Sequence, residues 1–242
     1  MAVTGGLSGD GARFGTTEVF LDGAPTSHEV VALGLYGKDL RVGYGSLGGW
    51  DPFGPDRLVT RSEGSVVYEL DGRPALDLYR EYLGEHAAGL PASGLLFPLS
   101  IRNEHAGLVR TILDVDREAR SLTFAGDVPQ GAYARLMRAN FDRLIDGATG
   151  AAKDAALPLA GAPAELAILI SCVGRKLVLK QRVEEELESV RDVLGDGAIL
   201  TGFYSYGELC PGATGACADL HNQTMTVTTL SEGTCTSSSP AN

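Results

Sequence analysis

The stretch Leu166–Cys172, with the sequence LAILISC, decides the fold of this 242-residue chain. Its first five residues form a continuous apolar run of strand length, which is typical of a strand buried on both faces. Residues 179–194 then carry apolar side chains at helical spacing, and residues 198–206 have the composition of a second strand. A strand, a helix and a strand in this order predict a crossover unit built around a central sheet.

The amino-terminal part has a different pattern. Short segments rich in β-branched and aromatic residues are separated by turn pairs such as Asp22-Gly23 and Asp71-Gly72, which predicts strands at residues 17–21, 28–36, 39–44 and 65–70. Further along, the patterns predict helices at 74–84 and 133–145, a hairpin that pairs 109–114 with 121–125, a long connection over 148–164, and a last strand at 222–230.

These elements predict an α+β protein. We expect a β-rich N-terminal module over residues 1–72, followed by a mixed αβ C-terminal module with a central sheet over residues 73–232. The Ser/Thr-rich residues 233–242 have little apolar content, and we expect them to form a flexible tail.

The charge balance excludes some classes of partner. The chain has 31 acidic and 20 basic residues, a net charge of -11, so its field repels a phosphate backbone and no nucleic-acid partner is expected. The most apolar long stretch, residues 155–174, is interrupted by Pro158, Pro163 and Glu165, so no membrane span is expected. The first six residues lack a signal-peptide pattern and the four cysteines are too few for a disulfide scaffold, which favours a cytoplasmic protein with reduced thiols.

Two familiar motifs are incomplete. The segment GYGSLG at residues 43–48 has dinucleotide-binding spacing, but Pro52 and Pro55 follow where that motif requires a helix, so we interpret it as a turn-rich structural loop. Around Ser205 the segment GFYSYG has one residue too many before the serine for a nucleophile elbow. Neither segment predicts nucleotide binding or serine catalysis.

The cysteine and histidine residues are compatible with a catalytic site, a metal site or a purely structural role. Cys172 ends the apolar strand, where it is either a nucleophile with His221 as its base or a small buried hydrophobe. Cys210 and Cys217 are soft-metal ligands by type, together with Cys172 and His221, but they lack the closely spaced cysteine pairs of a zinc knuckle. We expect no metal site and no catalytic residue, and keep a Cys172-dependent enzyme as an alternative.

Strand alternation groups several polar residues. In the last strand, His221 and Gln223 continue the apolar face of Met225 and Val227, while Asn222 shares the other face with threonines. In the preceding strand the same spacing aligns Tyr204, Tyr206 and Glu208. With Arg175, which follows the Leu166–Cys172 strand, these groups predict either a small polar pocket or a hydrogen-bonded network that fixes the sheet.

These same segments resemble a known family. The runs SCVGR at 171–175, GFYSYGE at 202–208 and LHNQTMT at 220–226 resemble signature segments of the FIST sensory family, the F-box and intracellular signal transduction proteins. The resemblance covers residues 71–232 as the family's C-terminal module. Residues 1–70 are similar to the latter part of its N-terminal module. Family members carry further elements before the equivalent of Gly5-Gly6, so the chain looks amino-terminally short.

The resemblance implies an intracellular sensory module that binds a small ligand, such as an amino acid, and signals to a separate output partner. Among the candidate groups, Arg175 suits a carboxylate, Glu208 suits an ammonium, and Tyr204, His221 and Asn222 suit orientation of the ligand. The full set of candidate ligand-binding residues is Cys172, Arg175, Tyr204, Tyr206, Glu208, His221, Asn222 and Gln223.

One subgroup of the family binds haem and senses nitric oxide, so a haem protein is the first alternative. Its axial ligand would be His28, His86, His105, His221 or a cysteine. A structural or scaffolding fragment that binds no ligand is a further alternative to the sensory module.

An amino-terminally short module should expose an apolar strand edge or face, and we therefore expect self-association. Among the thiols, we expect Cys172 to be inert and Cys235 to be the most reactive. We expect Cys210 and Cys217 to stay as thiols, with a reversible bridge between them as the alternative if their Cα atoms come within about 7 Å.

Overall fold

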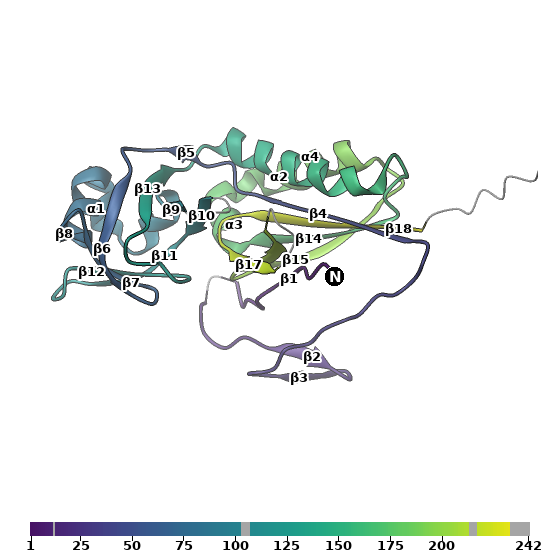
Figure 1. The fold of residues 1–242 in the computed structure, drawn as a ribbon, viewed down its shortest axis with the longest axis horizontal. Coiled ribbons are helices and arrows are strands. Elements are labelled where there is room, and N and C mark those ends of the chain that lie inside the picture. Colours follow the sequence, from purple (N-terminus) through teal and green to yellow (C-terminus); the bar gives the residue numbers. More distant parts are fainter. Residues whose placement is uncertain (12, 103–106, 213–216, 233–242) are drawn as a thin grey trace, which may run out of the picture.

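The computed structural model describes residues 1–242 except residues 12, 103–106, 213–216 and 233–242, so the expected tail and His105 lie outside the described residues. The described chain forms two lobes that meet at the centre of the molecule. A separate hairpin made of β2 (Val19–Leu21) and β3 (Ala24–Thr26) lies apart from both lobes (Figure 1). The fold is α+β, as expected.

A four-stranded sheet is the centre of the first lobe. Its strands run in the order β15 (Ile199–Ser205), β14 (Leu166–Cys172), β18 (Met225–Glu232) and β4 (Leu40–Leu47). Strands β14 and β15 are parallel, and the other neighbours are antiparallel. The parallel pair is joined through α3 (Val173–Leu179), the 3-10 turn η4 (Lys180–Arg182) and α4 (Val183–Leu194). The predicted crossover unit is confirmed.

Helix α2 (Phe141–Ala156) packs very closely on this sheet, and the 3-10 turn η3 (Leu157–Leu159) follows it. A Cβ atom added at Gly43 would lie 1.8 Å from the carbonyl oxygen of Ala155, and one added at Gly45 would lie 2.3 Å from that of Ala151. The GYGSLG segment is therefore not the turn-rich loop that we expected. It forms most of β4, and its glycines allow the helix to approach the strand.

A small second sheet covers one end of the opposite face. It consists of β1 (Gly5–Gly6), β16 (Glu208–Pro211) and β17 (Ala218–His221), all antiparallel. A Cβ atom at Gly6 would lie 2.6 Å from Cγ2 of Ile170, so β1 rests directly on β14. The hydroxyls of Thr4 and Thr228 are 2.8 Å apart and fasten the same segment to β18.

The second lobe is a nine-stranded antiparallel sheet with one α-helix, α1 (Ala75–Leu83), and two 3-10 turns, η1 (Gly84–Gly89) and η2 (Ala92–Leu96). Its main path follows the order β10 (Gly107–Arg110), β9 (Leu99–Arg102), β13 (Tyr133–Arg138), β6 (Arg57–Glu63), β7 (Val66–Leu70), β12 (Ser121–Phe124) and β11 (Ile112–Asp116). The short strands β5 (Asp51–Pro52) and β8 (Arg73–Pro74) pair with β13 and β7. The lobe has its own apolar core around Leu76 and Tyr79 of α1.

Strands from both sides of residue 72 contribute to both lobes. Strand β4 completes the sheet of the first lobe by pairing with β18, although it lies in the amino-terminal part of the sequence. Strands β6 and β7 pair with β13 and β12, which come from the carboxy-terminal part. The two halves of the sequence are thus interleaved in space.

Three elements predicted for the carboxy-terminal part are wrong in type or extent. Residues 133–145 are not one helix, because β13 occupies 133–138 and α2 begins after Asn140, whose side chain accepts a hydrogen bond from the Arg143 amide. The helix continues to residue 156 through the expected connection, because its alanines pack against the sheet. The strand expected at 222–230 begins only at Met225, as β18, because the chain bends at residues 222–223 after β17.

The expected exposed apolar surface is present in the amino-terminal part. Residues 28–36 do not form the predicted strand, and the side chains of Val30, Leu33 and Tyr36 are 92%, 84% and 88% exposed. Strands β2 and β3 pair only with each other among the described residues. Self-association through this surface stays a prediction.

Candidate functional site

The connection between β17 and β18 carries an unusual concentration of unpaired polar atoms. Seven buried side-chain nitrogen or oxygen atoms of the described residues have no hydrogen-bond partner, and four of them belong to His221, Asn222 and Gln223. They are His221 Nε2, both polar atoms of the Asn222 amide, and Gln223 Oε1. Because buried polar groups in folded proteins are normally paired, such a cluster marks the loop as a candidate functional site.

The backbone of this loop is also unusual. Gln223 has a φ of 61°, in the left-handed region that residues with a side chain rarely adopt. Its side chain lies against Gly174 at the start of α3, and its Nε2 reaches the carbonyl oxygen of Leu95 at 3.4 Å. Uncommon backbone conformations of this kind are found preferentially at functional sites.

Glu208 lies beside the loop and is fully buried. Its carboxylate accepts hydrogen bonds from Ser205 Oγ at 2.5 Å, from the Thr224 amide at 3.2 Å and from Thr224 Oγ1 at 3.0 Å. Burial raises the pKa of Glu208 to about 7, although these hydrogen bonds and the charge of Arg175 act in the opposite direction. The carboxyl group is therefore poised to change charge near neutral pH.

Cys172 is held in the same region, because its amide donates to the carbonyl oxygen of Thr224 at 3.1 Å. Burial raises the pKa of its thiol to about 12, and the nearby charge of Glu208 adds to the effect. A nucleophilic cysteine requires a lowered pKa, so this environment gives the Cys172-dependent enzyme no support.

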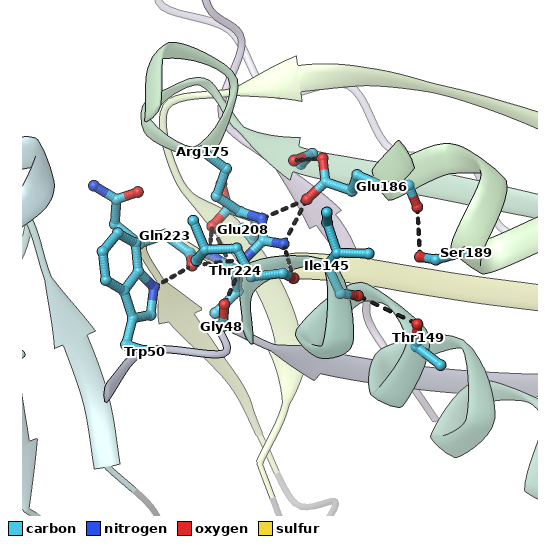
Figure 2. Close-up of polar contacts among 12 residues, drawn as sticks. Gly48, Trp50, Ile145, Thr149, Arg175, Glu186, Ser189, Glu208, Gln223 and Thr224 are labelled. Carbon is cyan, nitrogen blue, oxygen red and sulfur yellow. Dashed lines mark hydrogen bonds and ion pairs between the residues drawn. The ribbon is translucent and has the colours of Figure 1, made fainter. Parts of the chain in front are cut away.

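Arg175 is fully buried and has no free donor. Its guanidinium contacts Glu186 through Nε at 2.6 Å and through Nη2 at 2.5 Å. The remaining donors reach the carbonyl oxygens of Gly48 at 2.5 Å and Gln223 at 3.5 Å (Figure 2). They also reach the carbonyl oxygen of Leu144 at 2.7 Å. The expectation that Arg175 points into a pocket and takes a ligand carboxylate is wrong for this conformation, because α3 starts directly after β14 and turns the side chain into the core.

The two tyrosines do not join Glu208 on one face. Strand β15 ends at Ser205 and the chain turns before β16, so the alternation on which that expectation rested stops there. Tyr204 is half-buried, with Nζ of Lys176 4.4 Å from its ring centroid. Tyr206 instead holds the amino-terminal segment: its hydroxyl donates to Asp10, and its ring stacks on Phe14 at 5.0 Å.

The structure thus brings together Cys172, Glu208 and Gln223, and connects them to Arg175 through the core, whereas Tyr204 and Tyr206 lie elsewhere. Sequence reasoning missed three partners that this arrangement needs, namely Ser205, Thr224 and Glu186. A signal for Glu186 existed: it lies three residues after Val183 and four before Val190, on the apolar stripe of its helix, where a carboxylate must be paired.

The network continues into the amino-terminal part of the chain. The indole Nε1 of Trp50 donates to the carbonyl oxygen of Gln223 at 2.9 Å, next to the contact of Arg175 with Gly48 (Figure 2). Residues 48–50 connect β4 of one lobe to β5 of the other. The segment that joins the lobes therefore holds the 221–224 loop in position.

His221 is the remaining member of the loop. Its pKa is lowered by burial, an effect that the charge of Asp219 opposes. Among the residues described here, no three His, Cys, Asp or Glu side chains come together to hold a metal ion.

The candidate haem histidines among the described residues lie in different parts of the fold: His28 precedes β4, His86 lies in η1 and His221 ends β17. His28 and His86 are exposed, and His105 lies outside the described residues. Two hollows of about 670 and 600 Å³ in the described structure are lined by neither histidine nor cysteine.

The other thiols differ in access. Cys210 is buried, burial raises its pKa to about 11, and Cys217 is exposed. Both are free, and Cys210 lies opposite Asp219 in the β16–β17 pair, not opposite Cys217. Cys235 lies outside the described residues.

Comparison with known proteins identifies two family domains along the chain. Residues 1–73 match the FIST N domain and residues 75–211 match the FIST C domain. Uncharacterized proteins of Mycobacterium bovis and Mycobacterium tuberculosis are 29% identical over 232 residues, which cover 87% of this chain and 56% of theirs. An uncharacterized protein of Methanocaldococcus jannaschii is 27% identical over 175 residues, which cover 66% of this chain and 32% of that protein.

The chain therefore spans about half the length of the mycobacterial relatives that it matches. No solved structure matches it. None of the helices in the described part of the chain has the length and apolar character needed to cross a membrane.

Proposed function

Because this chain belongs to the FIST family, whose domains are sensory domains of signal transduction, we propose that it senses a compact polar ligand bound by the loop His221–Gln223. We place this activity in the cytoplasm, with a separate protein as the output partner. The main support for this proposal is the set of four buried polar atoms without a hydrogen-bond partner on three consecutive residues.

The unpaired atoms define the chemistry of the ligand. The Asn222 amide offers one donor group and one acceptor, and Gln223 Oε1 offers a second acceptor. A buried polar atom without a partner costs about 1–3 kcal/mol, so a ligand that satisfies several of them gains that free energy on binding. A small molecule with an acceptor and a donor close together, such as an amino acid, fits this requirement.

The residues that would bind the charged groups of a zwitterionic ligand differ from those expected from the sequence, which were Arg175 for the carboxylate and Glu208 for the ammonium. Every donor of Arg175 is engaged, so a ligand carboxylate would bind Asn222 Nδ2. A ligand ammonium would bind Gln223 Oε1 and favour the ionised form of Glu208 beside the loop. Binding of a zwitterion would then lower the pKa of Glu208 and release a proton near neutral pH.

The contacts of the loop supply a route for the signal. Gln223 is tied by its carbonyl oxygen to Trp50, and Arg175 ties the same region to Gly48 and to α2 through Leu144. A ligand that moves the loop changes these contacts at the connection between the lobes. A coupling free energy of about 1–3 kcal/mol would alter the affinity for a partner by roughly 5- to 150-fold.

A thermal-shift screen of amino acids, small organic acids and haem tests the proposal. A ligand present at about 100 times its dissociation constant stabilises the folded chain by about 2.7 kcal/mol. We expect a shift from a small zwitterion that disappears in Asn222→Leu and persists in Gln130→Leu, a matched change at an exposed position.

The variant Asn222→Leu should remain at least as stable as the wild type, because it removes two unpaired buried atoms without removing a hydrogen bond. A full ligand shift in Asn222→Leu would show that the ligand binds elsewhere. A shift from haem alone would favour the haem alternative over this proposal.

A further inference from the structure

We propose that the groove between β15 and α4 binds an extended segment of a partner protein, which adds to the free edge of β15 as a further strand and carries apolar and basic side chains. This surface is separate from the 221–223 loop and rests on different observations. It gives a docking place to the output partner.

The first observation is the unprotected edge. Strand β15 is the outer strand of its sheet and pairs only with β14 among the described residues. Its sequence, ILTGFYS, contains no charged residue and no proline. Natural edge strands normally carry such residues to prevent pairing with another chain, so a strand without them is suited to pairing.

The second observation is a groove beside that edge. It has a volume of about 670 Å³ and runs between α4 and β15, with Leu169, Leu200 and Met225 among its apolar lining. Leu187 of α4 and Phe203 of β15 line it with side chains that are 43% and 47% exposed. Thr201 and Gly202 in the middle of the strand line it as well. A free strand edge next to a helix-lined groove is the arrangement in which peptides add to a sheet.

The third observation is the charge of the groove. Glu188 and Asp192 of α4 line it and are exposed. The single basic residue of the lining, Arg191, donates through Nη1 to the carbonyl oxygen of Ala198 at 2.5 Å, and so is held at the start of β15. The chain as a whole has a net charge of -11. An extended segment with alternate apolar residues and interspersed lysine or arginine complements this surface.

The charge also decides between two occupants. The exposed apolar segment of residues 28–36 in a second copy is one possible occupant, since it belongs to no sheet among the described residues. However, that copy brings the same net charge of -11 to an acidic groove. A basic partner is therefore favoured over a second copy.

Fluorescence anisotropy with short labelled peptides tests the inference. We expect a peptide of alternating valine and lysine to bind about tenfold or more tightly than its valine and glutamate counterpart. The double variant Glu188→Lys/Asp192→Lys should remove this preference. The matched control Asp146→Lys/Glu184→Lys changes the net charge equally at exposed positions outside the groove and should retain it.

Hydrogen exchange then locates the bound peptide. We expect added protection of the amides of residues 199–205, and Asn222→Leu should bind the peptide as the wild type does, which separates this surface from the ligand site. Equal loss of binding in both charge variants would overturn the inference, because attraction would then be non-specific. Absence of protection at residues 199–205, or self-association that the variant Phe203→Lys abolishes in the absence of peptide, would overturn it as well.

Discussion

Arg175 and Glu186 form an ion pair in which both side chains are completely buried, with Nη2 and Oε1 2.5 Å apart. The pair joins α3 to α4, and the remaining donors of the guanidinium reach Gly48, Leu144 and Gln223. Arg175 thus links the three helices α2, α3 and α4 with the 221–224 loop and with the segment that connects the lobes.

Removing either partner should strongly destabilise the fold. The variants Arg175→Ala and Glu186→Ala each leave an uncompensated buried charge, which costs about 3–5 kcal/mol in the free energy of unfolding. Denaturant unfolding followed by circular dichroism measures this loss. The exposed ion pairs of Arg182 provide the control, and Arg182→Ala should have a much smaller effect. A change at Arg175 no larger than the control would contradict the network described here.

The contribution of Glu208 to stability should fall as the pH rises from 4.5 to about 7. Its pKa is raised from 4.5 to about 7 by burial, so the folded chain keeps a proton that the unfolded chain releases above pH 4.5. This contribution is complete below pH 4.5 and is lost by about pH 7, a difference of about 3 kcal/mol.

The variant Glu208→Gln removes this titration, and the comparison is made between the two proteins. His221, whose pKa is lowered by burial, acts in the opposite direction as the pH falls, but it is present in both. We expect the stability of the wild type relative to Glu208→Gln to decrease between pH 4.5 and 7, measured by urea unfolding. A difference that does not change with pH would exclude the raised pKa.

The variant Gly43→Ala should destabilise the first lobe. Its Cβ would lie 1.8 Å from the carbonyl oxygen of Ala155, so α2 must move away from β4. Overpacking of this kind costs about 1–3 kcal/mol, and the melting temperature should fall accordingly. Gly37→Ala is the matched control, because its nearest neighbour would be 3.6 Å away. Equal melting temperatures for the two variants would show that the sheet and helix are less closely packed than described.

The thiols should react in an order set by burial and pKa. Cys217 is exposed and should react before Cys210, while Cys172, with a pKa of about 12, should be the slowest of the three. Labelling of the native protein followed by mass spectrometry measures the order, and labelling in denaturant is the control in which all react. The expectation that Cys235 reacts before the others is measured in the same experiment. Early modification of Cys172 would restore the nucleophile hypothesis.

Local sequence patterns were sufficient to predict much of the first lobe. The apolar run at 166–170, the helical spacing after residue 179 and the strand near 199 determine a crossover, because a buried strand and an amphipathic helix each have a distinct period. The segments SCVGR, GFYSYGE and LHNQTMT were sufficient to indicate the family. Both kinds of information lie within short stretches of chain.

Only the tertiary structure decided where the polar side chains point. Period-2 alternation predicts a shared face only while a strand continues, and the turns after Ser205 and after His221 interrupt it. The guanidinium of Arg175 is chemically suited to binding a carboxylate. Whether that carboxylate belongs to a ligand or to Glu186 depends on how α4 folds back over β14, and no local sequence pattern predicts this. The orphaned atoms of Asn222 and Gln223 are likewise visible only in space, because a missing hydrogen bond is a property of all the neighbours that could have supplied it.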